Sequence, residues 1–493
     1  MNFKHIFFIL FGLISLSSCS KWIDVKPNDR LAEDVLFEDA SGYLKALNGV
    51  YVELAHDDLY GRFMTASALD AMAHYYYISA TGTSVPLYQD YAAYGYTEAH
   101  IKYGFDAAWQ KAYTLIANLN VIIEKCADAP SAALPEPYYA VVKGEALGLR
   151  AMLHFDMLRL FGPIWSETTK EKPCIPYAMT AHNEISPLSS SEQVMAYIEA
   201  DLSEALDLLQ ETDPIRTEGI NNGPGADNRN DFTYRQYRFN YFAVKALMAR
   251  TALWKGDKVK ALRYAEEVIQ EAQVGDEAIF PFVTLTADND IERPDRVFST
   301  EVIFSLYNIN RVKTYNEVFS ASLESDMRLS MNAMNEDMSR VNAMYDNSND
   351  YRLKAWEIEN APVSGSMVTN NKFKDYVDAP GRYMVPLIRI SELYLIAAEC
   401  SDNLEKASGY VNTLRHNRNV QDLTPAGFPE LADLIKAEYR REFLGEGQLF
   451  FYYKRCGLQN IPSYSQLTGD QTISLTNYQV PLPDSEIRWR AAE

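Results

Sequence analysis

Apolar residues recur at intervals of three or four positions along this 493-residue chain, and this spacing restricts the fold more than any other feature. On an α-helix the spacing places apolar side chains on one face, which then packs against a core. The stretches that predict helices are residues 41–55, 107–127, 138–161, 191–209, 239–255, 258–272, 388–399, 404–418 and 431–443. We therefore expect a mainly α-helical fold.

Several of these helices are expected to form pairs of the tetratricopeptide kind. Two segments share the same order of a small residue, a short polar turn and a second helix, which lets two helices approach closely. The matching positions are Ala252, Gly256, Asp257 and Ala261 in one segment and Ala398, Asp402, Asn403 and Ala407 in the other. Two looser pairs, 41–55 with 107–127 and 138–161 with 191–209, bring the expected number to about four.

Long insertions separate the predicted pairs, over residues 56–106, 210–238 and 275–387. A repeat scaffold that accepts such insertions tends to carry its binding function in them. The first insertion is rich in tyrosine and contains several glycines, and its spacing fits neither a helix nor a regular strand. Because tyrosine combines a flat apolar ring with a hydroxyl, it suits ligands that are partly apolar and partly polar.

The first insertion supplies most of the candidate ligand-binding residues. The rings that are candidates for stacking on a ligand are Tyr75, Tyr76, Tyr77, Tyr88, Tyr91 and Tyr94. The candidates for hydrogen bonding to it are Asp70, His74, Gln89 and Asp90. From the third insertion, we expect the far side of the site to be closed by Tyr315, Asn316 and Tyr345. For each tyrosine taken singly, packing inside a loop is the alternative role.

The start of the chain has the form of a bacterial lipoprotein signal. An apolar run over residues 6–16 follows a basic start and is too short to span a bilayer as a permanent helix. The box Leu16-Ser17-Ser18-Cys19 then predicts cleavage before Cys19 and lipidation of its thiol. The expected parts of the chain are a signal peptide (1–18), a lipid-anchored leash (19–30) and a single helical domain (31–493).

Composition argues against some classes of function. The chain has 67 acidic and 46 basic residues and a formal net charge of −21, which argues against binding to nucleic acid or to an anionic lipid surface. The cysteines beyond the signal are far apart and form no metal-binding motif; they are Cys126, Cys174, Cys400 and Cys456. We expect each to behave as a small buried apolar residue, with one disulfide left open, and we expect no cofactor.

The sequence contains no G-x-S-x-G, H-E-x-x-H, P-loop or Rossmann glycine motif. Residues 288–292 place oxygen-bearing side chains at alternate positions, as calcium loops do, but lack the central glycine and the distant glutamate of those loops. We expect this segment to be a solvated loop. A sequence does not show whether two carboxylates lie at the separation that a glycosidase needs. We nevertheless expect a binding protein rather than an enzyme.

A series of ordered motifs resembles the SusD/RagB family of outer-membrane nutrient-binding lipoproteins from Bacteroidetes-type bacteria. The motifs are Trp109, Tyr113, Ile116, Leu119 and Asn120; Gly144, Glu145, Ala146, Arg150, Phe155 and Asp156; Glu301 to Ser305; Asp350, Tyr351 and Arg352; Asn371, Lys372 and Phe373; Arg389 to Glu399; Arg440 to Phe443 with Glu446 and Gly447; and Pro481 to Pro483 with Glu486 and Ile487. Each motif is weak by itself, whereas their order behind a lipoprotein signal is specific.

The resemblance implies a SusD-like helical scaffold with a loop-rich ligand face, and a C-terminal RagB/SusD region from about residue 275 to 493. It also implies a place at the outer membrane, anchored through the lipid on Cys19 and facing outside. The implied partner is a SusC-like TonB-dependent barrel, over which the protein sits as a lid. Ligands of the family are mostly glycans, and peptides in some branches, with no catalysis implied. Glycan capture, peptide capture and a purely structural lid therefore stay open.

Several charged residues of these motifs lie on or beside otherwise apolar helices. They are Glu145, Arg150, Arg389, Glu392, Arg441 and Glu446. We expect them to form partly buried ion pairs that set the packing of the helices, because a buried charge without its partner costs roughly 3–5 kcal/mol. A role in ligand binding is the alternative.

Overall fold

The computed structural model of the protein describes residues 35–78, 87–181, 186–225, 228–284, 294–324, 326–331, 337–361, 365–464 and 470–491. The predicted signal peptide, the lipidation site Cys19 and the leash lie outside these residues, as does the calcium-like segment 288–292. No described helix is long and apolar enough to cross a membrane.

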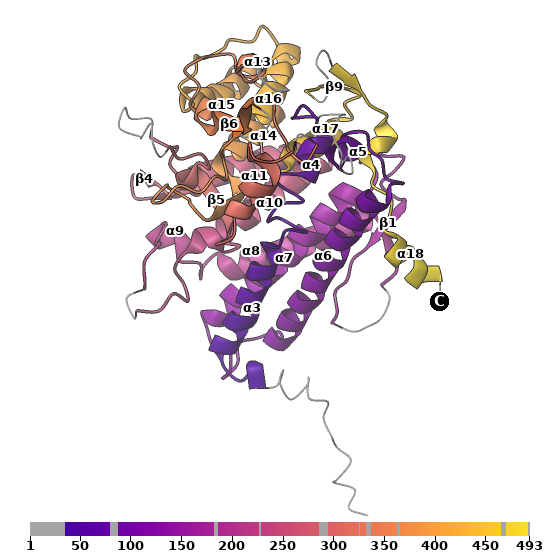
Figure 1. The fold of residues 1–493 in the computed structure, drawn as a ribbon. Helices are drawn as coiled ribbons and strands as arrows, with labels where there is room; N and C mark the ends of the chain where they lie inside the picture. Colours follow the sequence, from indigo (N-terminus) through magenta and orange to yellow (C-terminus); the bar gives the residue numbers. More distant parts are fainter. Residues whose placement is uncertain are drawn as a thin grey trace, which may run out of the picture.

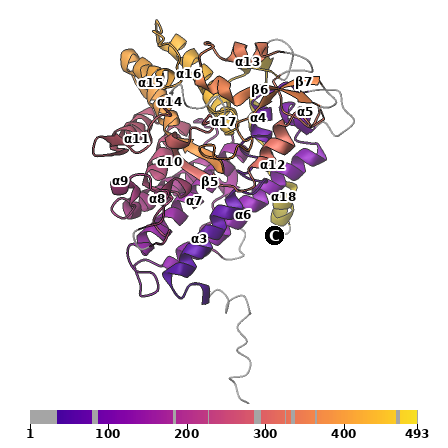
Figure 2. The same ribbon diagram turned by 60° about the vertical axis from the view of Figure 1, so that its left-hand side comes forward.

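Eight of the predicted helices form the four expected pairs. The pairs are α3 (Ala40–Leu54) with α6 (Ala99–Cys126), α7 (Tyr138–Phe161) with α8 (Ser191–Leu209), α10 (Tyr241–Trp254) with α11 (Lys258–Glu271), and α14 (Ile390–Cys400) with α15 (Leu404–His416). The ninth predicted helix is α16 (Phe428–Glu442). Each pair packs on the next, so that the pairs form a row from α3 and α6 to α14 and α15 (Figures 1 and 2). The mainly α-helical prediction is confirmed.

The turns that the sequence matched between two pairs are helix N-caps. The Asp257 carboxylate accepts a hydrogen bond from the Lys260 backbone N–H at 3.1 Å, and the Asn403 amide oxygen accepts one from Lys406 at 2.9 Å. Such a side chain satisfies one of the backbone donors that a helix start leaves free. The shared spacing therefore has a physical cause, which is the position at which each second helix begins.

Helix α7 lies at the centre of the row, and every residue from Tyr139 to Phe161 is buried. Two of its glycines permit close packing. A Cβ atom at Gly148 would lie 2.4 Å from the Phe239 ring, and one at Gly144 would lie 2.8 Å from Leu209. Both positions therefore need glycine for the neighbouring segments to approach.

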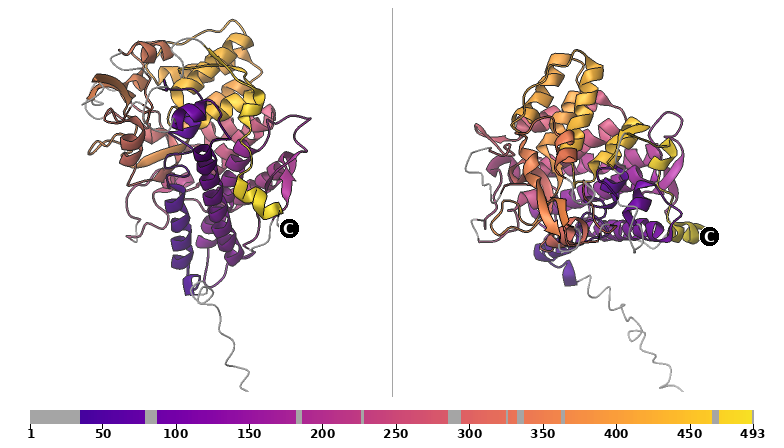
Figure 3. Two further views of the ribbon diagram at one scale, coloured as in Figure 1. Left: turned by 45° about the vertical axis from the view of Figure 1, so that its right-hand side comes forward. Right: turned by 45° about the horizontal axis from the view of Figure 1, so that its top comes forward.

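The insertions contain more regular structure than the predicted loops. The third insertion forms strand β5 (Val302–Tyr307), which pairs antiparallel with β8 (Met384–Arg389), and the hairpin β6 (Trp356–Ala361) with β7 (Gly365–Asn370). Further helices are α4 (Ala68–Met72), α5 (Leu87–Ala92), α9 (Ile215–Glu218), α12 (Val312–Thr314), α13 (Ser339–Met344), α17 (Gln448–Cys456) and α18 (Asp484–Ala491). Further strands are β1 (Pro173–Pro176), β2 (Leu188–Ser190), β3 (Gln273–Val274), β4 (Glu277–Ala278), β9 (Asn460–Pro462) and β10 (Asp470–Thr472). The C-terminal helix α18 lies against α6 (Figure 3).

All six charged motif residues form the expected ion pairs. Arg150 pairs with Asp201 at 2.7 Å, Glu392 with Arg250 at 2.5 Å, and Glu145 with Arg235. The remaining three pairs are Arg389 with Glu442, Arg441 with Glu438, and Glu446 with Lys372. Five of these pairs join parts of the chain that are distant in sequence, as expected for ion pairs that set the packing, whereas Arg441 and Glu438 lie three residues apart on α16.

Glu442 is the centre of the largest set of buried charges, which we call the charge network. Its carboxylate accepts hydrogen bonds from Arg389 at 2.5 Å, Arg418 at 2.6 Å and Arg352 at 3.1 Å. Arg418 also pairs with Glu301 at 2.6 Å. Burial alone raises the pKa of Glu442, but Arg418 and Arg389 hold this pKa well below its ordinary value. The carboxylate therefore stays ionised inside the protein.

The cysteines differ in exposure. Cys126, Cys174 and Cys400 are buried, as predicted, whereas Cys456 is exposed, so that the prediction of a buried residue is wrong there. The reason is its position in the last turn of α17, which ends at Gly457 with a left-handed φ of 60°. All four are free thiols, and the disulfide that the sequence left open is not formed.

Replacing Glu442 is expected to destabilise the fold strongly. Glu442→Gln removes the charge that three buried arginines share, and we expect the free energy of unfolding to fall by about 3–5 kcal/mol in urea denaturation. The matched control on the same helix is Asp433→Asn, in an exposed pair with Lys436, for which we expect a change of about 0–1 kcal/mol. Equal effects of the two changes would contradict a structural role of the network.

Candidate functional site

The tyrosines that were expected to form an exposed platform lie in the core. Tyr75 and Tyr76 are wholly buried, and Tyr88, Tyr91 and Tyr94 are less than a tenth exposed. The prediction of exposed stacking rings is therefore wrong for these five residues. The physical reason is that the first insertion folds inward, with α4 packed on α17 and α5 packed on α4 and α6.

The hydroxyl groups of these rings bond inside the protein. Tyr75 donates to the Arg440 backbone oxygen at 2.8 Å, and Tyr94 donates to that of Met72 at 2.9 Å. The ring of Tyr91 lies 5.9 Å from that of Phe105 in an edge-to-face contact. Packing, which was the alternative role for each tyrosine, accounts for them.

Two of the expected polar contacts are also buried. Asp70 accepts a hydrogen bond from the Gly445 backbone N–H at 2.7 Å, and burial raises its pKa to about 8. The Nδ1 atom of His74 lies 3.0 Å from the Ser463 hydroxyl, and burial lowers the pKa of His74 to about 4. Both side chains hold the first insertion to the C-terminal part of the chain and do not reach the surface.

The first and third insertions meet, as expected, but their contact is closed by buried residues. The Tyr77 backbone N–H donates to Ser330 O at 2.8 Å. Tyr315 and Tyr345 are both buried. The Tyr315 hydroxyl donates a hydrogen bond to Glu359 at 2.8 Å, and the Tyr345 hydroxyl accepts one from the Trp356 ring N–H at 3.3 Å. The residues of this region that keep exposed or half-exposed side chains are Tyr77, Gln89, Asp90 and Asn316, and their contact with a ligand stays a prediction.

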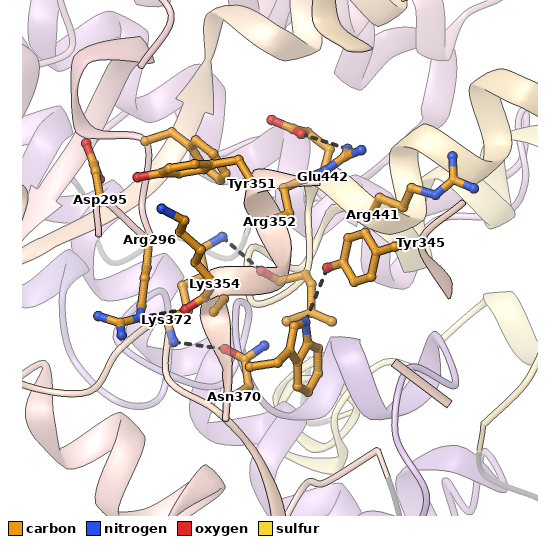
Figure 4. Close-up of a pocket in the computed structure, with 14 residues that line it drawn as sticks. Asp295, Arg296, Tyr345, Tyr351, Arg352, Lys354, Asn370, Lys372, Arg441 and Glu442 are labelled. Carbon is orange, nitrogen blue, oxygen red and sulfur yellow. Dashed lines mark hydrogen bonds and ion pairs between the residues drawn. The ribbon is translucent and has the colours of Figure 1, made fainter. Parts of the chain in front are cut away.

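A cavity beside the charge network is too small for an organic ligand. Its lining includes Tyr345, Tyr351, Arg352, Asn370 and Glu442, which Figure 4 shows around it. Its volume is about 20 Å³, enough for about one water molecule. Because most of its wall is buried and includes the ion-paired Arg352 and Glu442, this cavity belongs to the core and not to a ligand site.

An open hollow of about 490 Å³ lies between α3, the second insertion and the end of β5, and we call it the tyrosine groove. Ligand sites commonly have volumes of about 300–1,000 Å³. The residues that line the groove are Leu44, Asn48, Asn222, Asn230, Asp231, Tyr234, Tyr237, Arg238 and Tyr307. Three tyrosines and three asparagines therefore surround one open volume.

The rings of the tyrosine groove are arranged for contact with a ligand. The Tyr307 side chain is 52% exposed, and its ring meets that of Tyr237 edge to face, with centroids 5.7 Å apart. The centroid of the Tyr383 ring lies 5.3 Å from that of the Tyr307 ring. Burial raises the pKa of Tyr237 to about 12, so that its hydroxyl keeps its proton at neutral pH and can donate a hydrogen bond.

The backbone of the groove is held by a buried arginine. Arg235 pairs with Asp213 at 2.8 Å and with Glu145 of α7. The next residue, Gln236, donates to Val302 O at 2.8 Å. Tyr234 precedes Arg235, and its backbone lies in the left-handed region, with a φ of 56°, which bulky residues rarely adopt. The backbone strain at Tyr234 persists because the ion pairs of Arg235 fix the turn that follows.

The charges of the groove are already paired within the protein. Asp231 accepts a hydrogen bond from the Tyr138 hydroxyl at 2.9 Å and pairs with Arg229 at 2.5 Å. The Arg238 guanidinium lies 4.8 Å from the centre of the Tyr51 ring. The exposed amides of Asn48, Asn222 and Asn230 each offer a donor and an acceptor. Ring faces and amides together can bind a ligand with apolar C–H faces and hydroxyl groups.

The tyrosines of the groove, Tyr234, Tyr237 and Tyr307, are not among the residues predicted from the sequence to bind a ligand. The high number of tyrosines in residues 75–94 predicted a binding site there, although the number of tyrosines does not distinguish buried rings from exposed ones. A more useful signal was present in residues 220–238, where asparagines and glycines precede two tyrosines that flank a single arginine. Polar turn-forming residues around aromatic rings indicate a surface position more directly than the number of rings.

Replacing the buried carboxyl group of Asp70 is expected to change how stability depends on pH. The pKa of Asp70 is 3.8 in the unfolded chain and about 8 in the fold, so that its stabilising effect is complete below about pH 4 and is lost as the pH rises to about 8. This loss is at most about 1.4 kcal/mol per pH unit. Asp70→Asn cannot titrate, and we expect its free energy of unfolding to fall less than that of the unmodified protein between pH 5 and 8.

The control for this prediction is Asp433→Asn, which changes an exposed carboxylate on α16. Urea denaturation at four pH values between 5 and 8 measures the slopes. Parallel slopes for the unmodified protein and Asp70→Asn would contradict the raised pKa.

Two family models match most of the chain. Residues 21–216 match a SusD-like model described as starch-binding and associating with the outer membrane, and residues 286–488 match the model of the SusD family. A search of curated proteins gives no match. The first match contains the tyrosine groove residues of α3, and the second contains the charge network.

Solved structures share the fold. A SusD superfamily protein from Bacteroides thetaiotaomicron is 21% identical, with a TM-score of 0.68 over 91% of this chain and 98% of that chain. A SusD-like carbohydrate-binding protein from Bacteroides vulgatus is 17% identical, with a TM-score of 0.68 over 91% and 96%. A SusD superfamily protein from the same species is 19% identical, with a TM-score of 0.65 over 92% and 98%. The similarity extends over nearly the whole length of each protein.

Proposed function

Because the chain belongs to the SusD-like family, we propose that it is an outer-membrane lipoprotein that binds a glycan and delivers it to a SusC-like TonB-dependent barrel. The sequence supports the lipid anchor, since Cys19 ends the box expected for lipidation and residues 19–30 are expected to serve as a leash. The family description, which associates its members with the outer membrane, supports the location. The anchored body faces outside in this proposal.

The tyrosine groove is the proposed binding site, and the observation that carries this proposal is the exposed Tyr307 ring beside three asparagine amides in one open volume. Sugar rings have apolar C–H faces that stack on aromatic rings and hydroxyl groups that bond to amides. The groove supplies both kinds of group, whereas the cavity of the charge network has room for about one water molecule.

We propose binding without catalysis. Glycoside hydrolysis commonly uses a pair of carboxylates on opposite sides of the bond that breaks. Among the described residues that line the groove, Asp231 is the one carboxylate, and it is held by Tyr138 and Arg229. A bound glycan would therefore meet no such pair in the groove.

Removal of the exposed ring is expected to weaken glycan binding. Tyr307→Ala deletes a stacking surface of roughly 60 Å², which at about 25 cal/mol per Å² corresponds to about 1.5 kcal/mol, or about a tenfold rise in Kd. The measurement is binding of the detergent-solubilised mature protein to a broad glycan array, followed by calorimetry on the glycans that bind. Tyr103→Ala is the control, because Tyr103 is 76% exposed and lies outside the groove.

Each outcome of the array has a definite meaning. Glycan binding that Tyr307→Ala weakens and Tyr103→Ala does not supports the proposed site. Glycan binding that neither change affects would place the site elsewhere, with Gln89, Asp90 and Asn316 the next residues to replace. Absence of glycan binding with capture of peptides would replace the proposal by the alternative, a RagB-like lid of a peptide importer.

A further inference from the structure

A second open hollow adjoins the tyrosine groove. Its volume is about 500 Å³, and it shares Asn222 and Tyr237 with the groove. Its outer wall is formed by the β3–β4 hairpin and by α9, and its other wall by residues 299–300 before β5. Because both hollows are lined by these two side chains, they adjoin, and we call the two together the channel.

The second hollow carries negative charge. Glu218 at the end of α9 and Glu277 of β4 are exposed and line it. Among the described residues that line this hollow there is no lysine, arginine or histidine. The lining of the tyrosine groove has one acidic side chain, Asp231, which pairs with Arg229, and one basic side chain, Arg238. The combined lining therefore has three acidic side chains and one basic side chain.

The remaining lining of the second hollow is neutral. Ile220, Val274 and Ile279 supply apolar surface, and Ser299 and Thr300 supply hydroxyl groups. Apolar patches between hydroxyls suit the alternating faces and edges of a sugar chain. An acidic chain, with a carboxylate or sulfate on its units, would meet Glu218 and Glu277 without a cation to offset them.

We infer that the channel takes an extended neutral oligosaccharide, with part of the chain on the tyrosine groove and part in the second hollow. This inference rests on the proposed function and adds to it the length and charge of the ligand. Tyr237 lies at the junction of the two parts, so that the chain crosses its ring. The acidic wall weakens the binding of chains that carry uronate or sulfate groups.

Chain length provides the first test. Calorimetry with the detergent-solubilised mature protein compares the disaccharide and the hexasaccharide of a neutral glycan that the array identifies, and the hexasaccharide is expected to bind at least tenfold more tightly. Ala278→Trp on the exposed strand β4 fills the second hollow, and it is expected to weaken hexasaccharide binding about tenfold. The control is Ala93→Trp, at an exposed position outside the channel.

Charge provides the second test. The array carries neutral glucans, mannans, xylans and galactans beside oligogalacturonates, alginate fragments and sulfated chains. The neutral group is expected to bind and the acidic groups to be at least tenfold weaker. The double variant Glu218→Gln with Glu277→Gln is expected to reduce this difference, since it removes the acidic wall.

The results separate this inference from the proposed function. Tight binding of acidic chains, or hexasaccharide binding that Ala278→Trp leaves unchanged, would overturn the inference while glycan capture stands. Absence of binding to every glycan on the array would overturn both. Preference for long neutral chains, lost on filling the second hollow, supports both.

Discussion

The ionised carboxylate of Glu442 is the interaction on which the arrangement of the insertions depends. It lies on α16 and binds arginines from three other parts of the chain, which are Arg389 at the start of α14, Arg418 after α15 and Arg352 in the third insertion. Through Arg418 it also reaches Glu301 beside β5. Replacement of a buried ion pair by apolar residues is often neutral for stability, whereas removal of one partner costs about 3–5 kcal/mol, so the network favours placements of the strands in which every charge is paired.

The same principle operates on a smaller scale at the tyrosine groove. The Arg235 side chain of the second insertion is buried, and it pairs with Glu145 on α7 and with Asp213, which follows α8 in the sequence. Tyr51 of α3 joins this cluster, since its hydroxyl donates to Glu145 at 2.6 Å. These contacts attach the segment that carries Tyr234 and Tyr237 to the helix pairs that contain α3 and α7.

The helices and the ion pairs could be predicted from the sequence, because their signals are local. Asp257 and Asn403 mark helix starts by the side chains they carry, and charged residues on apolar helices such as Arg389 must find partners. The partners themselves could not be predicted, since Arg389 and Glu442 meet through tertiary packing. The tyrosines of the first insertion were misassigned for the same reason. Whether Tyr75 stacks on a ligand or on the core depends on where α4 and α5 fold, and residue spacing does not record this.

The ion pairs of Arg235 beneath the tyrosine groove also have a thermodynamic consequence. A recognition loop that orders on contact loses conformational entropy at that moment, and this loss reduces affinity. Tyr234 and Tyr237 flank a turn whose arginine is already paired in the interior, so that the ordering has taken place during folding. Association can then proceed as contact between two preformed shapes, with little rearrangement of the backbone. The conformational strain at Tyr234 therefore lowers the free energy of unfolding and does not reduce the affinity for a ligand.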